Sequence, residues 1–252
     1  MKDKLIFLLS QPRSGSSFLQ IQLSFHNSIY SPPESSFLLK YIYDFNSYDN
    51  VAFDTNYATH SWHELLSKET SELHKKEFRN FIFRFYENII TSDNKYFLDK
   101  SPRYYHIAKN LLDFFPDSKF IILLRNPLAV LNSLLNYHYN NNFNKELSNY
   151  TCHDLFNSLK IFNSLWIDKK KYKNIIFVKY EDITQNPKKN LNFIFRFLSL
   201  NPNETHDQID NHFLSSSFVD PNAKRYLKPT MKFSNSWLDQ ISSFQKKNAF
   251  IF

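Results

Sequence analysis

Three short, continuous runs of apolar residues constrain the fold of this chain more than any other feature. They lie at Leu5–Leu9, in Lys119–Leu124 and in "NIIFVKYEDI" (174–183). Runs of this kind are typical of strands buried on both faces of a parallel sheet. Apolar residues between them recur at helical spacing, and "KYFLDKSP" (95–102) indicates one more short strand. Strands that alternate with helices predict an α/β fold, with a central parallel sheet flanked by helices.

The chain is long enough for one such domain with a large core. It has 252 residues, 42% of them hydrophobic, and shows no internal repeat and no linker that would divide it. We therefore expect residues 1–252 to form a single domain. Cys152 is the only cysteine, which excludes an internal disulfide. No apolar stretch reaches the length of about 20 residues of a membrane span, and we expect a cytoplasmic protein.

The first apolar run leads into "PRSGSS" (12–17), which contains Gly15, the only glycine of the chain. A helix follows this turn, so its N-terminal N–H groups and dipole favour an anion. Gly15 allows unusual backbone angles and the close approach of a phosphate. Ser14, Ser16 and Ser17 add hydroxyl donors, and Arg13 adds a fixed positive charge. The alternative is an ordinary helix capped by serine. The loop by itself leaves both a P-loop-like anion site and a capped helix open.

This loop differs from the P-loop of nucleotide triphosphatases, GxxxxGK[ST]. Ser16 stands where that motif has its lysine, and the run at 119–124 ends in Arg125 instead of a magnesium-binding aspartate. The sequence therefore predicts phosphate binding without a metal. Arg125 and Ser133, eight residues apart, could both face the carboxyl edge of the sheet and hold a second phosphate. The alternative for Arg125 is a structural ion pair beside Pro127.

Two of these segments resemble the sulfotransferase family that uses 3′-phosphoadenosine-5′-phosphosulfate (PAPS). "QPRSGSSFL" (11–19) is similar to the family's 5′-phosphosulfate loop, and "FIILLRNPLAVLNSLL" (120–135) to its 3′-phosphate segment. "VKYEDI" (178–183) resembles a third segment, which implies that Tyr180 lies near the nucleotide. "FLDKSPRYYHI" (97–107) resembles the segment that brings a lysine, here Lys100, to the sulfuryl group in tyrosylprotein- and carbohydrate-type members.

The C-terminal part of the chain resembles the family less closely. "RYLKPTMKFSNSW" (225–237) is similar to the segment that covers the cofactor, which makes Lys228 and Ser236 candidates for cofactor binding. The usual glycine and lysine before Trp237 are absent.

The resemblance implies sulfuryl transfer from PAPS to a hydroxyl or amine, with PAP (3′-phosphoadenosine-5′-phosphate) as the product and no metal. Arg13 and Lys100 would stabilise charge on the leaving oxygen, as in other group transfers that depend on positioning and electrostatics. Glu34, in "SPPESSF" (31–37), matches the place of the general base in tyrosylprotein-type members. Cytosolic members use a histidine, for which His106 and His138 are the candidates here.

Other functions stay open at this point. A net charge of +7 fits nucleic acid, a membrane surface or a polyanionic small molecule. A phosphotransferase would use the loop for a nucleoside phosphate, but it would need magnesium. A nucleic-acid-binding module would need clustered charge, and the lysines are scattered. We therefore expect no nucleic-acid partner. The segments 35–62 and 138–150 are rich in Tyr, Phe, Asn and His, and we expect them to bind a small-molecule, carbohydrate or peptide acceptor.

Overall fold

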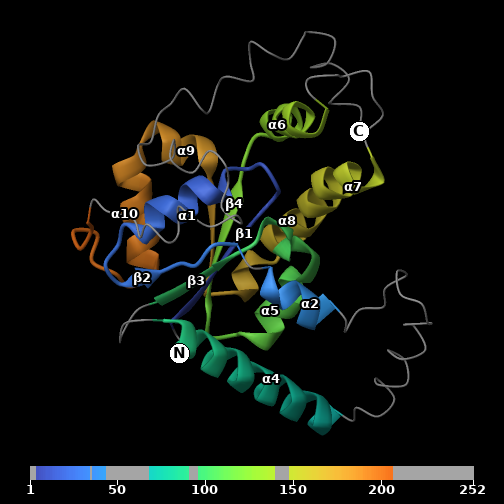
Figure 1. Ribbon diagram of the computed structural model, residues 1–252, viewed down its shortest axis with the longest axis vertical. Coiled ribbons are helices and arrows are strands. Elements are labelled where there is room, and N and C mark those ends of the chain that lie inside the picture. The colour runs from blue at the N-terminus through green and yellow to red at the C-terminus, as the bar shows by residue number, and fades with distance from the viewer. Residues whose placement is uncertain (1–3, 35, 44–67, 91–95, 140–147, 207–252) are drawn as a thin grey trace.

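A parallel sheet with helices on both faces forms the body of the molecule (Figure 1). The computed structural model describes residues 4–34, 36–43, 68–90, 96–139 and 148–206. Within these ranges the strands follow the spatial order β2-β3-β1-β4-β5, and every neighbouring pair is parallel. Their bounds are β1 Leu5–Ser10, β2 Ile29–Tyr30, β3 Tyr96–Lys100, β4 Lys119–Leu124 and β5 Ile175–Lys179. The predicted α/β architecture is confirmed.

Helices connect the strands and cover the two faces of the sheet. One face packs against α1, α9 and α10, and the other packs against α2, α4, α5, α8 and the 3₁₀ helix η1 (Figure 1). The helical elements of the described residues are α1 Ser16–Ser24, α2 Phe37–Tyr43, α4 Lys68–Ile89, η1 Pro102–Ile107, α5 Ala108–Phe114, α6 Pro127–Tyr139, α7 Asn149–Cys152, η2 His153–Asn157, α8 Ser158–Ile167, η3 Lys169–Lys171, α9 Tyr180–Gln185 and α10 Pro187–Phe197. None of the helices described is both long and apolar enough to cross a membrane.

Strand β1 lies at the centre of the sheet, and all six of its residues are buried. Its side chains alternate between two hydrophobic clusters. Phe7 stacks on Phe120 in one cluster, and Leu8 belongs to the other, which also contains Phe18 of α1. A strand buried on both faces explains the continuous apolar run, because neither face of it meets water.

The chain reverses its direction across the sheet between β1 and β4. After β1 it continues to β2 and β3 on one side, whereas after β4 it continues to β5 on the other. Such a switch point leaves a crevice beyond the carboxyl ends of the two strands, where α/β proteins bind ligands. Arg13 follows β1 and Arg125 follows β4, so both arginines stand at this crevice.

Two segments differ from their predicted secondary structure. The third apolar strand ends at Lys179, and Tyr180 begins α9, because Glu181 and Asp182 favour the first turn of a helix. From the spacing of its apolar residues we expect a regular helix near 153–170, but this region begins as the π-helical segment η2. There the buried amide of Gln11 donates to the Leu155 carbonyl at 3.0 Å. A side chain inserted at a carbonyl is a common companion of such a distortion.

Candidate active site

Gly15 sits at the N-cap of α1 in the left-handed region, with φ +92° and ψ 22°. L-residues that carry a side chain rarely adopt this backbone conformation. A Cβ at this position would also lie 2.4 Å from the ring of Tyr180. The predicted need for glycine angles is confirmed, and the structure adds a second reason in the aromatic ring. Backbone geometry and packing therefore both require glycine here.

The N-terminus of α1 presents backbone donors beside the loop. The Leu19 N–H donates to the Gly15 carbonyl at 3.0 Å, which is the first hydrogen bond of the helix. Helical geometry leaves the N–H groups of Ser16, Ser17 and Phe18 without an acceptor inside the helix. Ser14 has a structural role instead, because its hydroxyl donates to the Gln11 carbonyl at 2.5 Å and so stabilises the turn. The loop thus offers an electropositive cradle for an anion.

The two arginines predicted to bind phosphate meet at this loop. The Arg13 Nε donates to the Ser133 hydroxyl of α6 at 3.3 Å, and the Arg13 guanidinium lies over the ring of Tyr137, 4.6 Å from its centroid. The Arg125 Nη1 donates to the Arg13 carbonyl at 2.9 Å. Ser133 therefore contacts Arg13 directly, and Arg125 joins the cluster through the backbone of the loop.

Tyr180 forms the wall of the site on the β5 side. Its ring is buried, meets Phe18 edge to face at 5.7 Å, and carries the Arg125 guanidinium 4.5 Å from its centroid. Burial raises the pKa of the Tyr180 hydroxyl, while the charge of Arg125 lowers it in part. The phenol is therefore neutral at physiological pH. Stacking on a ring holds the guanidinium in one plane, which suits the recognition of a phosphate.

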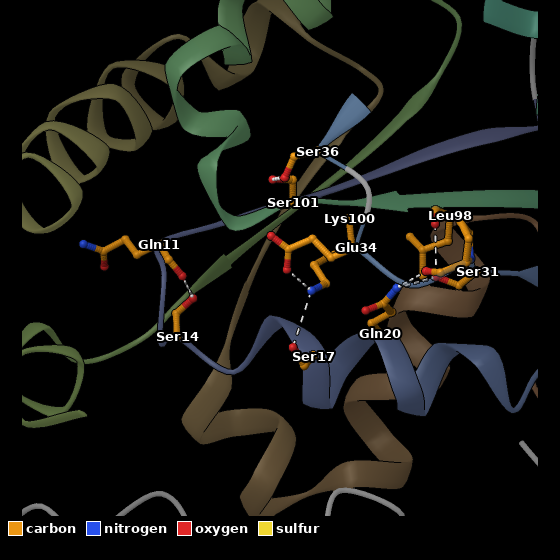
Figure 2. Close-up of polar contacts among 11 residues, drawn as sticks. Gln11, Ser14, Ser17, Gln20, Ser31, Glu34, Ser36, Leu98, Lys100 and Ser101 are labelled. Carbon is orange, nitrogen blue, oxygen red and sulfur yellow. Dashed lines mark hydrogen bonds and ion pairs between the residues drawn. The ribbon is translucent and has the colours of Figure 1, made fainter. Parts of the chain in front are cut away.

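Lys100, Glu34 and Ser17 form the second half of the site (Figure 2). The Lys100 ammonium lies 2.7 Å from Glu34 Oε2 and 3.4 Å from the Ser17 hydroxyl. The Lys100 side chain is only 3% exposed, whereas that of Glu34 is 26% exposed. A lysine at the end of β3 and a carboxylate from the β2–α2 connection are thus brought to the helix N-terminus. The Glu34 side chain is thus partly exposed to solvent.

A buried carboxyl group lies next to Lys100 along the chain. Asp99 Oδ2 accepts hydrogen bonds from the hydroxyls of Tyr86 and Tyr104, the second at 2.9 Å. Burial raises the pKa of Asp99 to about 6, although both tyrosine hydrogen bonds act against this rise. The Tyr104 hydroxyl also accepts from the Leu38 N–H at 3.3 Å. This network links β3 to α2 and α4 directly behind the lysine.

One histidine candidate packs against other rings, and the side chain of the other lies outside the described residues. His106 lies on η1, where its ring stacks on Tyr105 at 4.1 Å and on His153 at 4.9 Å. Burial, followed by the influence of His153, lowers the pKa of His106 to about 4. The side chain of His138, together with Lys228, Ser236 and most of segments 35–62 and 138–150, lies outside the described residues.

Sequence reasoning missed three buried polar residues around the site: Gln11, Gln20 and Asp99. Each stands in or next to an apolar stretch, which is the only sign of its function in the sequence. Their partners lie 5 to 144 positions away along the chain. A sequence pattern of period 2 or 3.6 carries no information about such contacts.

The residues of the site fit a nucleotide with two anionic groups. Two arginines, one lysine and a helix N-terminus are all donors for oxyanions. Within the described ranges, no three His, Cys, Asp or Glu side chains lie close enough together to hold a metal ion. The described residues therefore define the class of protein by its architecture: a parallel α/β sheet with a P-loop-like turn at its switch point.

The chain belongs to the sulfotransferase family, because the model of that family matches residues 6–204. It is therefore a transferase, and the enzymes of this family transfer a sulfuryl group. The alternative of a phosphotransferase is not favoured. A search of curated proteins finds no match to the chain.

Solved structures of sulfotransferases share the fold over nearly the whole chain. A sulfotransferase domain from the curacin biosynthetic pathway is 22% identical with a TM-score of 0.62, and 98% of this chain and 96% of that one are covered. A sulfotransferase domain of the Synechococcus PCC 7002 olefin synthase is 20% identical with a TM-score of 0.59, and the alignment covers 98% and 94%. A mouse sulfotransferase complexed with PAP is 14% identical with a TM-score of 0.51, with 100% and 83% covered.

Proposed function

We propose that residues 1–252 form one sulfotransferase domain that uses PAPS as its donor, without a metal. When bound, PAPS supplies the sulfuryl group, which passes to a hydroxyl or amine of a small-molecule, carbohydrate or peptide acceptor. The family match supports the reaction, and a neighbouring structure that contains PAP supports the donor. The contact that carries the proposal is the one that joins Lys100 to both Glu34 and Ser17.

The loop and the two arginines would hold the nucleotide. The N–H groups of Ser16 and Ser17, with the Arg13 guanidinium, would bind the 5′-phosphosulfate. Arg125 and Ser133 would bind the 3′-phosphate, with Tyr180 fixing the plane of Arg125. Lys228 would add a contact from the C-terminal segment, as the resemblance of that segment to the family implies.

Lys100 would stabilise the charge that develops on the leaving oxygen. Its ammonium is buried and lies within hydrogen-bonding distance of the Ser17 hydroxyl at the helix N-terminus. A fixed positive charge in such a place stabilises the transition state more than the ground state, because negative charge on the leaving oxygen grows during the reaction. Arg13, which belongs to the same loop, would also stabilise the charge on the leaving oxygen.

Glu34 would take the proton from the acceptor. Its carboxylate is paired with Lys100 at 2.7 Å, yet part of the side chain remains exposed to an incoming acceptor. A base must lie within hydrogen-bonding reach of the proton that it removes, and this partial exposure permits it. His106 is less suited, because it stacks between Tyr105 and His153.

The test is transfer of labelled sulfuryl from PAPS to a panel of phenols, sugars and peptides in the presence of EDTA. We expect labelled product and PAP to form together, and Lys100→Met to lose most of this turnover. Lys109→Met, which removes an exposed lysine of α5, is the matched control. Labelling that requires added magnesium, or that survives in full in Lys100→Met, would overturn the proposal.

A further inference from the structure

The buried amide of Gln20 ties together three elements that carry the reacting groups (Figure 2). Its Nε2 donates to the Ser31 hydroxyl and to the Pro32 carbonyl, both at 2.8 Å. The Ser31 hydroxyl in turn donates to the Leu98 carbonyl of β3 at 3.0 Å. Gln20 is only 1% exposed. One side chain of α1 therefore binds the segment before Glu34 and, through Ser31, the strand that ends in Lys100.

The position of Gln20 on α1 means that its hydrogen bonds connect the Glu34 segment to the helix that faces the anion site. Gln20 lies three residues after Ser17, so the two side chains lie on the same side of the helix. Ser17 meets Lys100, and Gln20 holds the backbone two residues before Glu34. The helix whose N-terminus faces the anion site therefore also sets the distance between that site and the carboxylate.

A second contact holds the other end of the Glu34 segment. The hydroxyls of Ser36 and Ser101 lie 2.9 Å apart, and Ser36 has a left-handed φ of 49°. A non-glycine residue in this region costs free energy, so its surroundings must hold it in place. Pro32 and Pro33 restrict the backbone between the two contacts. The carboxylate is thus carried on a short segment that is fixed before and after it.

We propose that Gln20 is a positioning residue for sulfuryl transfer, which places Glu34 relative to Lys100 through Ser31 and Pro32. The proposal rests on the proposed function, because it takes Glu34 as the base. The Gln20 side chain is buried, so we assign it no contact with the acceptor or the donor. Both N–H donors of the Gln20 amide make hydrogen bonds to the segment before Glu34. An apolar side chain of similar length would remove these hydrogen bonds but would preserve the packing of α1.

The first experiment measures the segment itself and needs no acceptor. Hydrogen–deuterium exchange is compared in wild type, Gln20→Met and Gln22→Met, the last a buried glutamine two residues further on, about 200° around α1. We expect uptake in peptides spanning residues 29–34 to rise about tenfold in rate in Gln20→Met alone, because its hydrogen bonds there are lost. Unchanged uptake in these peptides would overturn the proposal.

The second experiment measures turnover of PAPS, with water as the acceptor, in a double-mutant cycle. Gln20→Met should lower kcat by about 10- to 100-fold, as expected when a reacting group is misplaced, and leave the affinity for PAP unchanged. In the Glu34→Gln protein, Gln20→Met should cause no further loss, because no base remains to be positioned. An equal loss in both backgrounds would mean a merely structural function and would overturn the proposal.

Two further variants separate the possible failures. Ser31→Thr keeps the hydroxyl and should resemble wild type in uptake and turnover, whereas Ser31→Ala should resemble a milder form of Gln20→Met. Ser31→Ala also serves as the test if Gln20→Met does not fold, with wild-type uptake and kcat as the contradicting result. Full turnover in Glu34→Gln would refute the proposed base, while the exchange data would still decide whether Gln20 holds the segment.

Discussion

The ring of Tyr180 lies so close to Gly15 that a Cβ at position 15 would be 2.4 Å from two of the ring carbons. The same ring carries the Arg125 guanidinium on its face. A change in the turn would therefore displace the residue that supports the proposed 3′-phosphate contact. The loop, the aromatic wall and the arginine form one packed unit.

Gly15→Ala should abolish binding of PAP while the protein stays folded. A left-handed alanine costs about 1–2 kcal/mol, and the clash with Tyr180 adds to that cost. Adding Tyr180→Ala should relieve the clash and restore part of the lost thermal stability, but not the binding. Titration calorimetry and thermal melting check both statements. Wild-type affinity in a folded Gly15→Ala protein would show that the glycine is not needed for binding.

Arg125→Ala should weaken the binding of PAP by about 1.5–3 kcal/mol, which is typical of a hydrogen bond to a charged group. The measurement is made in excess EDTA, where wild type should bind PAP fully. Arg196→Ala, at an exposed arginine in the last turn of α10, is the control and should bind as wild type. A strict need for magnesium in wild type would contradict the metal-free account.

The contribution of Asp99 to the free energy of unfolding should increase as the pH falls from 7.5 to 5. Its folded-state pKa of about 6 lies above the ordinary value of 3.8, mainly through burial. The native state therefore binds a proton in this range that the unfolded chain does not, and stability is lost as the pH rises through 6. Relative to Asp99→Asn, wild type should gain about 1 kcal/mol in the free energy of unfolding between pH 7.5 and pH 5.

Urea unfolding of both proteins at the two pH values checks this difference. His106 acts in the opposite direction, because its lowered pKa of about 4 costs stability as the pH falls below 6.5. It is present in both proteins and cancels in the comparison. A difference that stays constant with pH would show that Asp99 is ionised throughout the range.

Much of the site could be predicted from the sequence because its parts lie at the ends of predictable elements. Arg13 and Arg125 each follow a buried strand, and the carboxyl ends of adjacent parallel strands meet at one edge. The contact of Arg13 with Ser133 joins residues 120 positions apart, both named from their motifs. The two-residue strand β2 escaped prediction, since it is too short to show a period.

The supporting residues could not be predicted, because their contacts depend on how the elements pack. Gln20 reads as an ordinary polar position of an amphipathic helix, yet it is buried against Ser31 and Pro32. Asp99 has the pattern of a carboxylate near a strand end, yet it accepts hydrogen bonds from two tyrosines, one on α4 and one on η1. Burial of a polar group costs free energy unless it is hydrogen-bonded, so such residues mark places where the structure fixes geometry.

The most direct test of the central claim compares sulfuryl transfer by wild type, Glu34→Gln and His106→Asn, with PAP affinity measured for each. The claim is that Glu34, paired with Lys100 at 2.7 Å, is the base of a PAPS-dependent transfer. We predict that Glu34→Gln binds PAP but loses about 10²- to 10⁴-fold in turnover, as expected for loss of a general base. His106→Asn should retain turnover. Full activity in Glu34→Gln together with an inactive His106→Asn would contradict the claim.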